Sequence, residues 1–261
     1  MLSRLRHLSR PRAVALCALP AAALIAVAAL APLPFTVARP GMTADVLGER
    51  DGRPVISVQG ARTAAVDGQL RMTTIEATGP DADVRLADVV DGWFRTDRAV
   101  MPSDAVYPSG DDVREIERYN AEQMRASQDD ATAAALSYLG RDPDDVKVTL
   151  RLADVGGPSA GLLFSLGIIE KLGTDLAGDR VVAGTGTISP DGVVGPVGGV
   201  ALKTRAAVRD GATVFLVPEA ECGDALAERP QGLRLVPVTS LKSAVTSLTA
   251  LRTGKGGVPS C

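Results

Sequence analysis

An uncharged run of 26 residues, 13–38, is the feature that most constrains how this chain can fold. A helix that crosses a bilayer needs about 20 apolar residues, whereas a cleavable signal peptide has an apolar core of about 7 to 15. The length of the run therefore predicts a transmembrane anchor at residues 13–38. Small-x-small triplets such as residues 26–28 leave a cleaved signal open as the alternative.

The charges before this run predict its orientation. Residues 1–12 contain four arginines and the only histidine of the chain, His7. Basic residues that flank a spanning helix stay on the cytoplasmic side of the membrane. We therefore expect a cytoplasmic basic segment at residues 1–12, a single-pass anchor in the cell membrane, and an extracytoplasmic domain after Arg39.

Two of the three cysteines lie in the part that is expected outside. These are Cys222 and Cys261, whereas Cys17 falls within the apolar run. Because disulfides persist in an oxidising compartment, we expect Cys222 and Cys261 to pair and to attach the C-terminal tail to the domain. Such a bond would stabilise the fold by about 3 to 4 kcal/mol. Two free thiols are the alternative.

Hydrophobic periodicity beyond the anchor predicts a mixed α/β (α+β) fold. Residues 41–140 combine short strand patterns with a helical pattern at 112–139. Between these patterns, a polar stretch with Trp93 and residues 102–110 is expected to form a surface loop.

Residues 146–252 alternate between strand and helix patterns and are expected to form the second part of the domain. The expected strands are 146–152, 181–188, 213–217 and 233–238, and the expected helices are 158–172, 199–210 and 239–251. Residues 140–145 (GRDPDD) separate the two parts like a linker, and residues 253–261 form the tail.

Composition and motifs exclude several functional classes. A net charge of −3 and a pI near 5.3 provide no broad basic field, so no nucleic-acid partner is expected. Because His7 lies on the cytoplasmic side, a Ser/His/Asp catalyst or a catalytic zinc site is not expected outside. Residues 184–189 and 202–204 match phosphate-binding loops only in part. We therefore expect no nucleotide, cofactor or metal.

A serine at a predicted helix start and a lysine on a later helix remain as candidates. Pro158 suits a first helical turn, so Ser159 would lie where unpaired N–H groups could stabilise an oxyanion. Without histidine, a neutral lysine is the standard remaining base, and the apolar neighbours of Lys203 would lower its pKa toward about 7 to 8. A simple helix cap at Ser159 and a solvated charge at Lys203 are the alternatives.

The segments around these residues resemble the proteolytic domain of Lon proteases. That family carries its nucleophile in a (D/G)GPSAG segment and its lysine in a GG-x-x-x-K segment. Here residues 156–161 are GGPSAG and residues 198–203 are GGVALK. Between them, residues 184–188 (GTGTI) resemble the TG-x-I segment of the family. Gly156 stands where many Lon proteases have Asp.

The resemblance implies a role for each matching residue. Ser159 would be the nucleophile, Lys203 its base, and Thr185 would offer its hydroxyl to the lysine. Independently of the resemblance, the predicted helix start implies that the backbone of Gly157, Pro158 and Ala160 holds the oxyanion of the intermediate.

The chain is also similar to a subgroup of bacterial Lon-like proteins that have no ATPase domain. Members have an N-terminal membrane helix, an early segment similar to residues 68–74, and usually a PDZ domain before the Lon domain. This chain has no room for a PDZ domain of about ninety residues, and residues 140–145 mark the place where it would sit. Since PDZ domains bind peptides by strand addition, the route of substrate capture stays open.

Together, these features predict an ATP-independent, membrane-anchored serine endopeptidase that uses a Ser/Lys dyad on extracytoplasmic polypeptides. One alternative is a catalytically weak Lon-like binding or scaffold module on the outer face of the membrane. Another is an esterase or a self-processing protein with the same dyad. Because Lon domains often form hexameric rings, a homo-oligomeric ring is a further expectation.

Overall fold

The structure is a computed structural model that describes residues 10–108, 112–152 and 157–261, with side chains from residue 18 onward. Most of the predicted basic segment, residues 1–9, lies outside the described residues, and so does Gly156.

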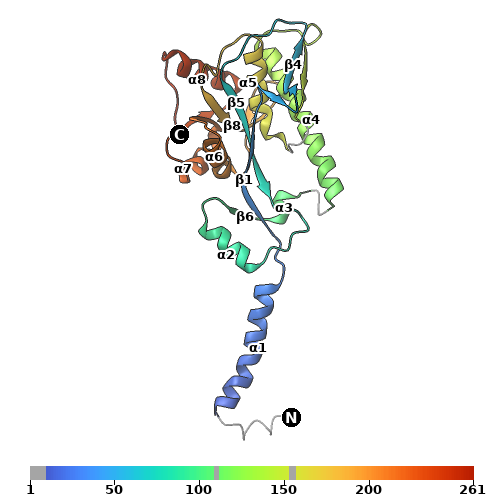
Figure 1. The fold of residues 1–261 in the computed structure, drawn as a ribbon, viewed down its shortest axis with the longest axis vertical. Coiled ribbons are helices and arrows are strands. Elements are labelled where there is room, and N and C mark those ends of the chain that lie inside the picture. Colours follow the sequence, from blue (N-terminus) through green and yellow to red (C-terminus); the bar gives the residue numbers. More distant parts are fainter. Residues whose placement is uncertain (1–9, 109–111, 153–156) are drawn as a thin grey trace.

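A six-stranded mixed sheet forms the centre of the molecule, in the order β12-β11-β8-β5-β1-β6 (Figure 1). Its strands are β1 (Phe35–Asp45), β5 (Gln69–Ala77), β6 (Ala99–Pro102), β8 (Val181–Gly184), β11 (Val214–Pro218) and β12 (Arg234–Val238). From β5 to β12 neighbouring strands are parallel, whereas β1 pairs antiparallel with both β5 and β6.

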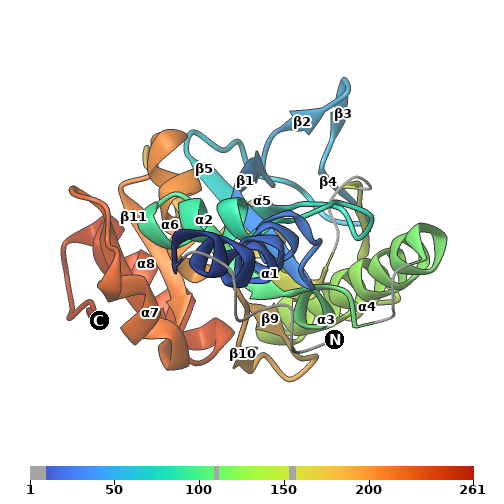
Figure 2. The same ribbon diagram turned by 90° about the horizontal axis from the view of Figure 1, so that it is seen from below.

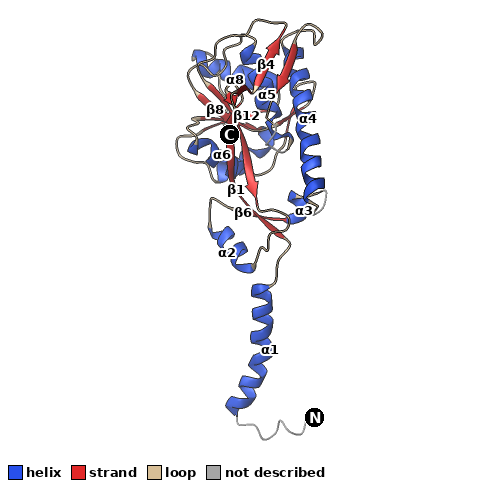
Figure 3. Cartoon of the chain, turned by 45° about the vertical axis from the view of Figure 1, so that its right-hand side comes forward, coloured by secondary structure: helices blue, strands red, loops and turns tan. Residues whose placement is uncertain are grey.

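Further short strands, among them β4 (Ile56–Gln59), pair in twos outside the central sheet (Figure 3). The pairs are β2 (Glu49–Arg50) with β3 (Arg53–Pro54), β4 with β7 (Lys147–Leu150), and β9 (Thr187–Ile188) with β10 (Val194–Gly195).

Helices pack around the central sheet or, in the case of α1 (Arg10–Leu30), extend away from it (Figure 1). They are α1, α2 (Leu86–Phe94), α3 (Ser103–Val106), α4 (Val113–Tyr138), α5 (Gly161–Lys171), α6 (Val200–Arg209), α7 (Cys222–Ala227) and α8 (Leu241–Thr253), with 3-10 turns η2 (Pro158–Ala160) and η3 (Glu219–Glu221). Helices α5 and α8 pack on one face, with α4 against α5, and helices α6 and α7 pack on the other.

Strand β11 shows why this part of the fold was predictable from sequence. Val214 and Leu216 point into the core on the α5 side, whereas Phe215 and Val217 point into the core on the α6 side. A strand that is buried on both faces needs a continuous apolar run, and that is the pattern that predicted it.

The N-terminal helix differs from its predicted bounds of 13–38. It ends at Leu30, and residues 35–38 belong to β1. Pro32 and Pro34 explain the end, since proline lacks the N–H that a helix needs and disfavours helical backbone in the residue before it. Helix α1 projects from the body (Figure 1), and residues 18–30 are all exposed. In the part of the chain that is described, no helix reaches the combined length and hydropathy of a membrane span.

The two predicted parts of the domain share one sheet. Strand β5, from the first part, pairs with β8, from the second, so residues 140–145 are a turn within the fold rather than a boundary between folding units. The prediction of a surface loop with Trp93 and residues 102–110 is wrong in two respects, because Trp93 lies on α2 and residues 103–106 form α3. Residues 109 and 110 lie outside the described residues. The spacing of Leu86, Val89, Val90 and Trp93 is the helical signal that was missed.

Candidate active site

Ser159 lies in the 3-10 turn η2, directly before helix α5. Gly157 precedes the turn with a φ of +91°, a conformation that favours glycine. Pro158 then occupies the first position of the turn, where its missing N–H costs little. Ser159 is half-buried and lines a cavity of about 360 Å³.

Hydrogen bonds from two other segments hold this turn in place. On α4, the Ser127 hydroxyl donates to the carbonyl of Pro158 at 3.0 Å. From the link between β8 and β9, the Gly186 N–H donates to the Ser159 carbonyl at 3.0 Å, and the Thr185 hydroxyl donates to the same oxygen at 3.3 Å. The nucleophile candidate therefore stands on a fixed backbone.

The glycine at the end of the GGPSAG segment has a packing reason. A Cβ at Gly161 would lie 2.8 Å from Ile188 Cγ2 and 3.0 Å from Ser127 Oγ. Both distances are shorter than ordinary contacts, so only glycine lets α5 begin this close to α4 and β9.

Lys203 lies on α6, and its side chain is only 4% exposed. Its Nζ donates to the Thr185 hydroxyl at 3.0 Å, the contact that the family resemblance implied. Burial lowers the pKa of Lys203 from 10.5 to about 8, while the charge of Glu221 acts in the opposite direction. A sizeable fraction of this lysine is therefore neutral near pH 8, and a neutral amine can accept a proton.

Lys203 lines the same cavity as Ser159. The wall of this cavity is largely apolar and includes Ile75, Met101, Val106, Pro196 and Val197. Met101 and Val106 come from β6 and α3, which lie outside the segment that was predicted to be catalytic. Sequence reasoning missed them because only the sheet pairing between β6 and β1 brings them to the site.

Glu221 is another site residue that sequence reasoning missed. Its Oε1 accepts a hydrogen bond from the Val197 N–H at 3.1 Å, which ties η3 to the glycine-rich turn of the cavity wall. Its Oε2 is buried and has no hydrogen-bond partner among the described residues. No sequence signal beyond its position after β11 pointed to it.

One predicted oxyanion residue needs correction. Pro158 has no N–H and therefore cannot donate to an oxyanion. Its carbonyl instead accepts the hydrogen bond from Ser127 that fixes the turn. Gly157 and Ala160, the other two predicted residues, flank Pro158 and Ser159, with Gly157 half-buried and Ala160 buried.

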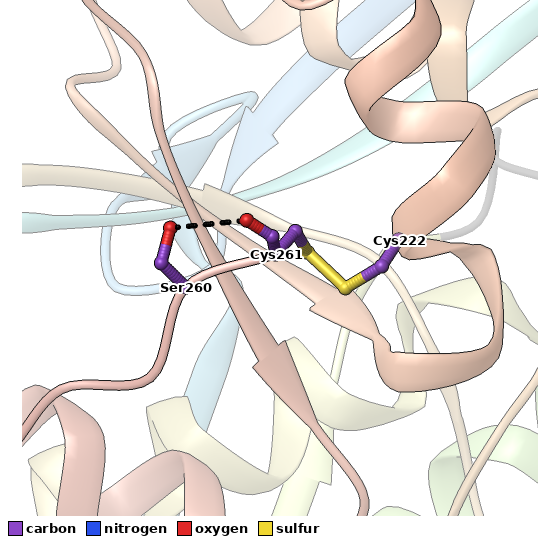
Figure 4. Close-up of a disulfide and its surroundings, with 3 residues drawn as sticks. All are labelled: Cys222, Ser260 and Cys261. Atoms are coloured by element: carbon purple, nitrogen blue, oxygen red, sulfur yellow. Dashed lines mark hydrogen bonds between the residues drawn. A yellow bond between two sulfur atoms is a disulfide. The ribbon is translucent and has the colours of Figure 1, made fainter.

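The predicted disulfide between Cys222 and Cys261 is present (Figure 4). It joins the start of α7 to the end of the tail, and both cysteines pack against the core on the α6 side. Because Cys222 directly follows Glu221, the bond also fixes the segment that carries this carboxylate.

Within residues 10–108, 112–152 and 157–261, no three or more His, Cys, Asp or Glu side chains gather as metal ligands would. The segment from Leu202 to Thr204 lies inside α6, and Lys203 donates to the Thr185 hydroxyl.

Comparison with known proteins places part of the chain in a protein family. The family model for the Lon protease (S16) C-terminal proteolytic domain matches residues 146–248. Lon protease 2 of Bacillus subtilis is 29% identical over 116 residues, which cover 43% of this chain and 21% of that protein. An archaeal Lon protease of Archaeoglobus fulgidus is 29% identical over 120 residues, covering 44% and 19%. A Lon protease of Chloroflexus aggregans is 38% identical over 89 residues, covering 32% and 10%.

The chain thus spans about a fifth of the length of the first two relatives. The prediction of a serine protease domain of the Lon type is confirmed for residues 146–248. This segment contains Ser159, Thr185 and Lys203.

Proposed function

Starting from this Lon-type (S16) serine protease domain, we propose that the chain is a peptidase in which Ser159 is the nucleophile and Lys203 its base. One observation carries the proposal. A buried lysine whose pKa is lowered to about 8 lines the same cavity as a serine on a fixed turn at a helix start. Catalytic bases need a pKa near the working pH, and burial supplies that shift here.

The reaction we propose is acyl transfer. Neutral Lys203 takes the proton of the Ser159 hydroxyl, and the serine oxygen attacks a peptide carbonyl. The tetrahedral intermediate then collapses, and the leaving amine takes the proton from Lys203. A water molecule, deprotonated by the same lysine, releases the acyl group from Ser159.

Thr185 would position the base in this scheme. Its hydroxyl accepts from Lys203 and donates to the Ser159 carbonyl, so one side chain links the two reacting residues. Backbone N–H groups of the turn, with Pro158 excepted, would stabilise the oxyanion.

A serine-reactive acylating probe tests the dyad, with labelling followed from about pH 6 to about pH 10. We expect labelling of the unaltered protein to rise with a midpoint near the pKa of Lys203, and Ser159→Ala and Lys203→Met to abolish it. Lys242→Met, at an exposed lysine on α8, is the control and should label normally. Absence of labelling at every pH would favour the alternative of a Lon-like binding module.

We further propose that the peptidase needs no nucleotide, as in the Lon-like subgroup without an ATPase domain, and acts on extracytoplasmic polypeptides. The residue before Lys203 supports the first part, because Leu202 stands where a phosphate-binding loop has glycine. Equal cleavage rates of a peptide with and without Mg²⁺-ATP are expected. A homo-oligomeric ring is a further part of the proposal, which sedimentation analysis checks.

Membrane attachment through α1 is the remaining part of the proposal. Helix α1 exposes large apolar side chains, each at least 63% exposed: Leu19, Leu24, Ile25, Val27 and Leu30. Contact of these side chains with water is unfavourable, and contact with a lipid surface would remove that cost. Helix α2 contacts α1, and its Trp93 and Phe94 are 69% and 87% exposed. Aromatic side chains of this kind favour the boundary between lipid and water.

The only tryptophan of the chain makes this part directly testable. Addition of phosphatidylglycerol vesicles should shift the emission of Trp93 to shorter wavelengths, and brominated lipids should quench it. A Phe94→Ser variant should bind the vesicles more weakly. Unchanged emission at saturating lipid would contradict lipid contact at α2.

A further inference from the structure

A second cavity, of about 610 Å³, lies between the β2–β3 hairpin, helix α4 and the end of β7. Among the residues that the structure describes, its charged lining is strongly basic, with four arginines and one aspartate. These residues are Arg50, Arg53, Arg125, Arg151 and Asp51. Met124 and Leu152, 4% and 2% exposed, add a buried apolar part to the lining.

The hairpin concentrates positive charge at this cavity. Asp51 and Gly52 have φ values of +52° and +70°, as the two central residues of a type I′ turn do. This turn fixes a register in which Arg50 and Arg53 are direct cross-strand partners. Figure 2 shows how the hairpin projects from the body.

The other two arginines come from separate parts of the chain. Arg125 lies on α4, and neither Arg125 nor Arg53 forms an ion pair with any residue that the structure describes. Arg151 follows β7 and donates to the neutral hydroxyl of Ser57 at 3.0 Å, which orients its guanidinium without cancelling its charge. Three segments of the chain thus bring positive charge to this cavity.

The cavity is linked to the candidate active site through α4. Gln128 lines the cavity, and its neighbour Ser127 holds the carbonyl of Pro158, next to Ser159. A ligand in the cavity would therefore contact the helix that supports the nucleophile.

We propose that this cavity binds an acidic stretch of the polypeptide substrate, with carboxylates on the arginines and an aliphatic side chain against Met124 and Leu152. Guanidinium groups bind carboxylates in a bidentate manner, which favours acidic over merely polar segments. The volume lies within the range of about 300 to 1,000 Å³ that organic ligands occupy, well above the need of a single ion. That the bound segment is a substrate rests on the proposed function, whereas the binding itself does not.

Fluorescence anisotropy with a labelled peptide rich in Asp, Glu and Leu tests the binding in the Ser159→Ala protein, where turnover is blocked. We expect the matching peptide with Asn and Gln in place of Asp and Glu to bind at least about tenfold more weakly. Arg53→Gln and Arg125→Gln should each weaken the acidic peptide about tenfold, and added salt should do the same. Arg118→Gln is the matched control, because Arg118 is exposed on the same helix and does not line the cavity.

Equal affinity for the two peptides, or an equal loss in the Arg118 variant, would overturn the inference. Binding of phosphatidylglycerol vesicles through the same arginines without peptide binding would overturn it too. In the protein with Ser159, Arg125→Gln should raise KM for an acidic substrate and leave KM for the matching Asn/Gln substrate unchanged. If the peptide binds but nothing is cleaved, the proposed function fails and the acidic site stands. If neutral peptides are cleaved but the acidic peptide does not bind, the acidic site fails and the proposed function stands.

Discussion

Lys203 illustrates at the scale of one residue how a site suited to chemistry weakens a fold. Its pKa is about 8 in the folded chain, against 10.5 for a lysine that is fully exposed to water. Between pH values of about 8 and 10.5, the unfolded chain binds more protons at this lysine than the folded chain does, so the free energy of unfolding rises with pH across that range. Below about pH 8 the full penalty of burying the ammonium applies, on the order of 3 kcal/mol.

Lys203→Met should therefore raise the free energy of unfolding near pH 7 by up to about 3 kcal/mol, less the lost bond to Thr185. This gain in the free energy of unfolding should shrink as the pH rises toward about 10. Urea denaturation at both pH values measures it, with Lys242→Met as a surface control. A variant that is destabilised equally at both pH values would show that burial of the charge costs nothing here.

Glu221 offers a second test at a single residue. Glu221→Gln removes a negative charge but keeps an oxygen that can accept from the Val197 N–H. Since the charge raises the pKa of Lys203, its removal should lower that pKa further and shift the midpoint of acylation to lower pH. Labelling at neutral pH should become faster.

Glu228→Gln is the matched control for this shift, because Glu228 is exposed and pairs with Arg205. Its acylation midpoint should equal that of the unaltered protein. A midpoint in Glu221→Gln that stays in place or moves upward would show that the carboxylate does not act on Lys203.

At the scale of elements, helix α4 contributes to the site although it lies outside the matched segment of residues 146–248. Its Ser127, 4% exposed, donates the hydrogen bond that fixes Pro158. Ser127→Ala should cost about 1 kcal/mol of stability and lower the acylation rate several-fold, because the turn loses a fixed contact. Ser137→Ala, at an exposed position on the same helix, should change neither quantity. An unchanged acylation rate in Ser127→Ala would limit this bond to a structural role.

Features of the fold that depend on one segment of the chain could be predicted from the sequence, whereas features that depend on contacts between distant segments could not. The strands β11 and β12 and the helices α6 and α8 were predicted because buried runs and periodic faces are encoded within each segment. The expected strand 181–188 divides into β8 and β9, since the bonds from Thr185 and Gly186 to Ser159 interrupt it. Those bonds depend on a segment 26 residues away, which periodicity does not show.

The site follows the same division. Ser159, Thr185 and Lys203 were predicted from short motifs that resemble those of Lon proteases, and each of these motifs lies within one segment of the chain. The cavity wall at Met101 and the carboxylate of Glu221 could not be located, because they reach the site only through tertiary structure.

For the whole molecule, the sheet joins the two parts of the chain into one folding unit. Strand β8 is flanked by β11, from the matched segment, and by β5, from outside it. Leu70 and Met72 on β5 are 0% and 1% exposed and belong to the main core. Helix α6, which carries Lys203, packs against β1 and β5 as well as β8.

A chain of residues 146–261 alone should therefore fail to fold cooperatively, even though it contains the whole Lon-type segment. Losing side chains such as Leu70 and Met72 from a core costs about 2 to 5 kcal/mol each, which by itself approaches the stability of a small domain. The exposed edge of β8 would also favour aggregation.

Removal of residues 1–30 should leave cooperative unfolding intact, because residues 18–30 are exposed. Circular dichroism melts and size-exclusion chromatography of the two truncated chains measure this difference. A sharp transition in residues 146–261 at the temperature of the longer chain would mean that β1 and β5 serve the cavity wall rather than the fold.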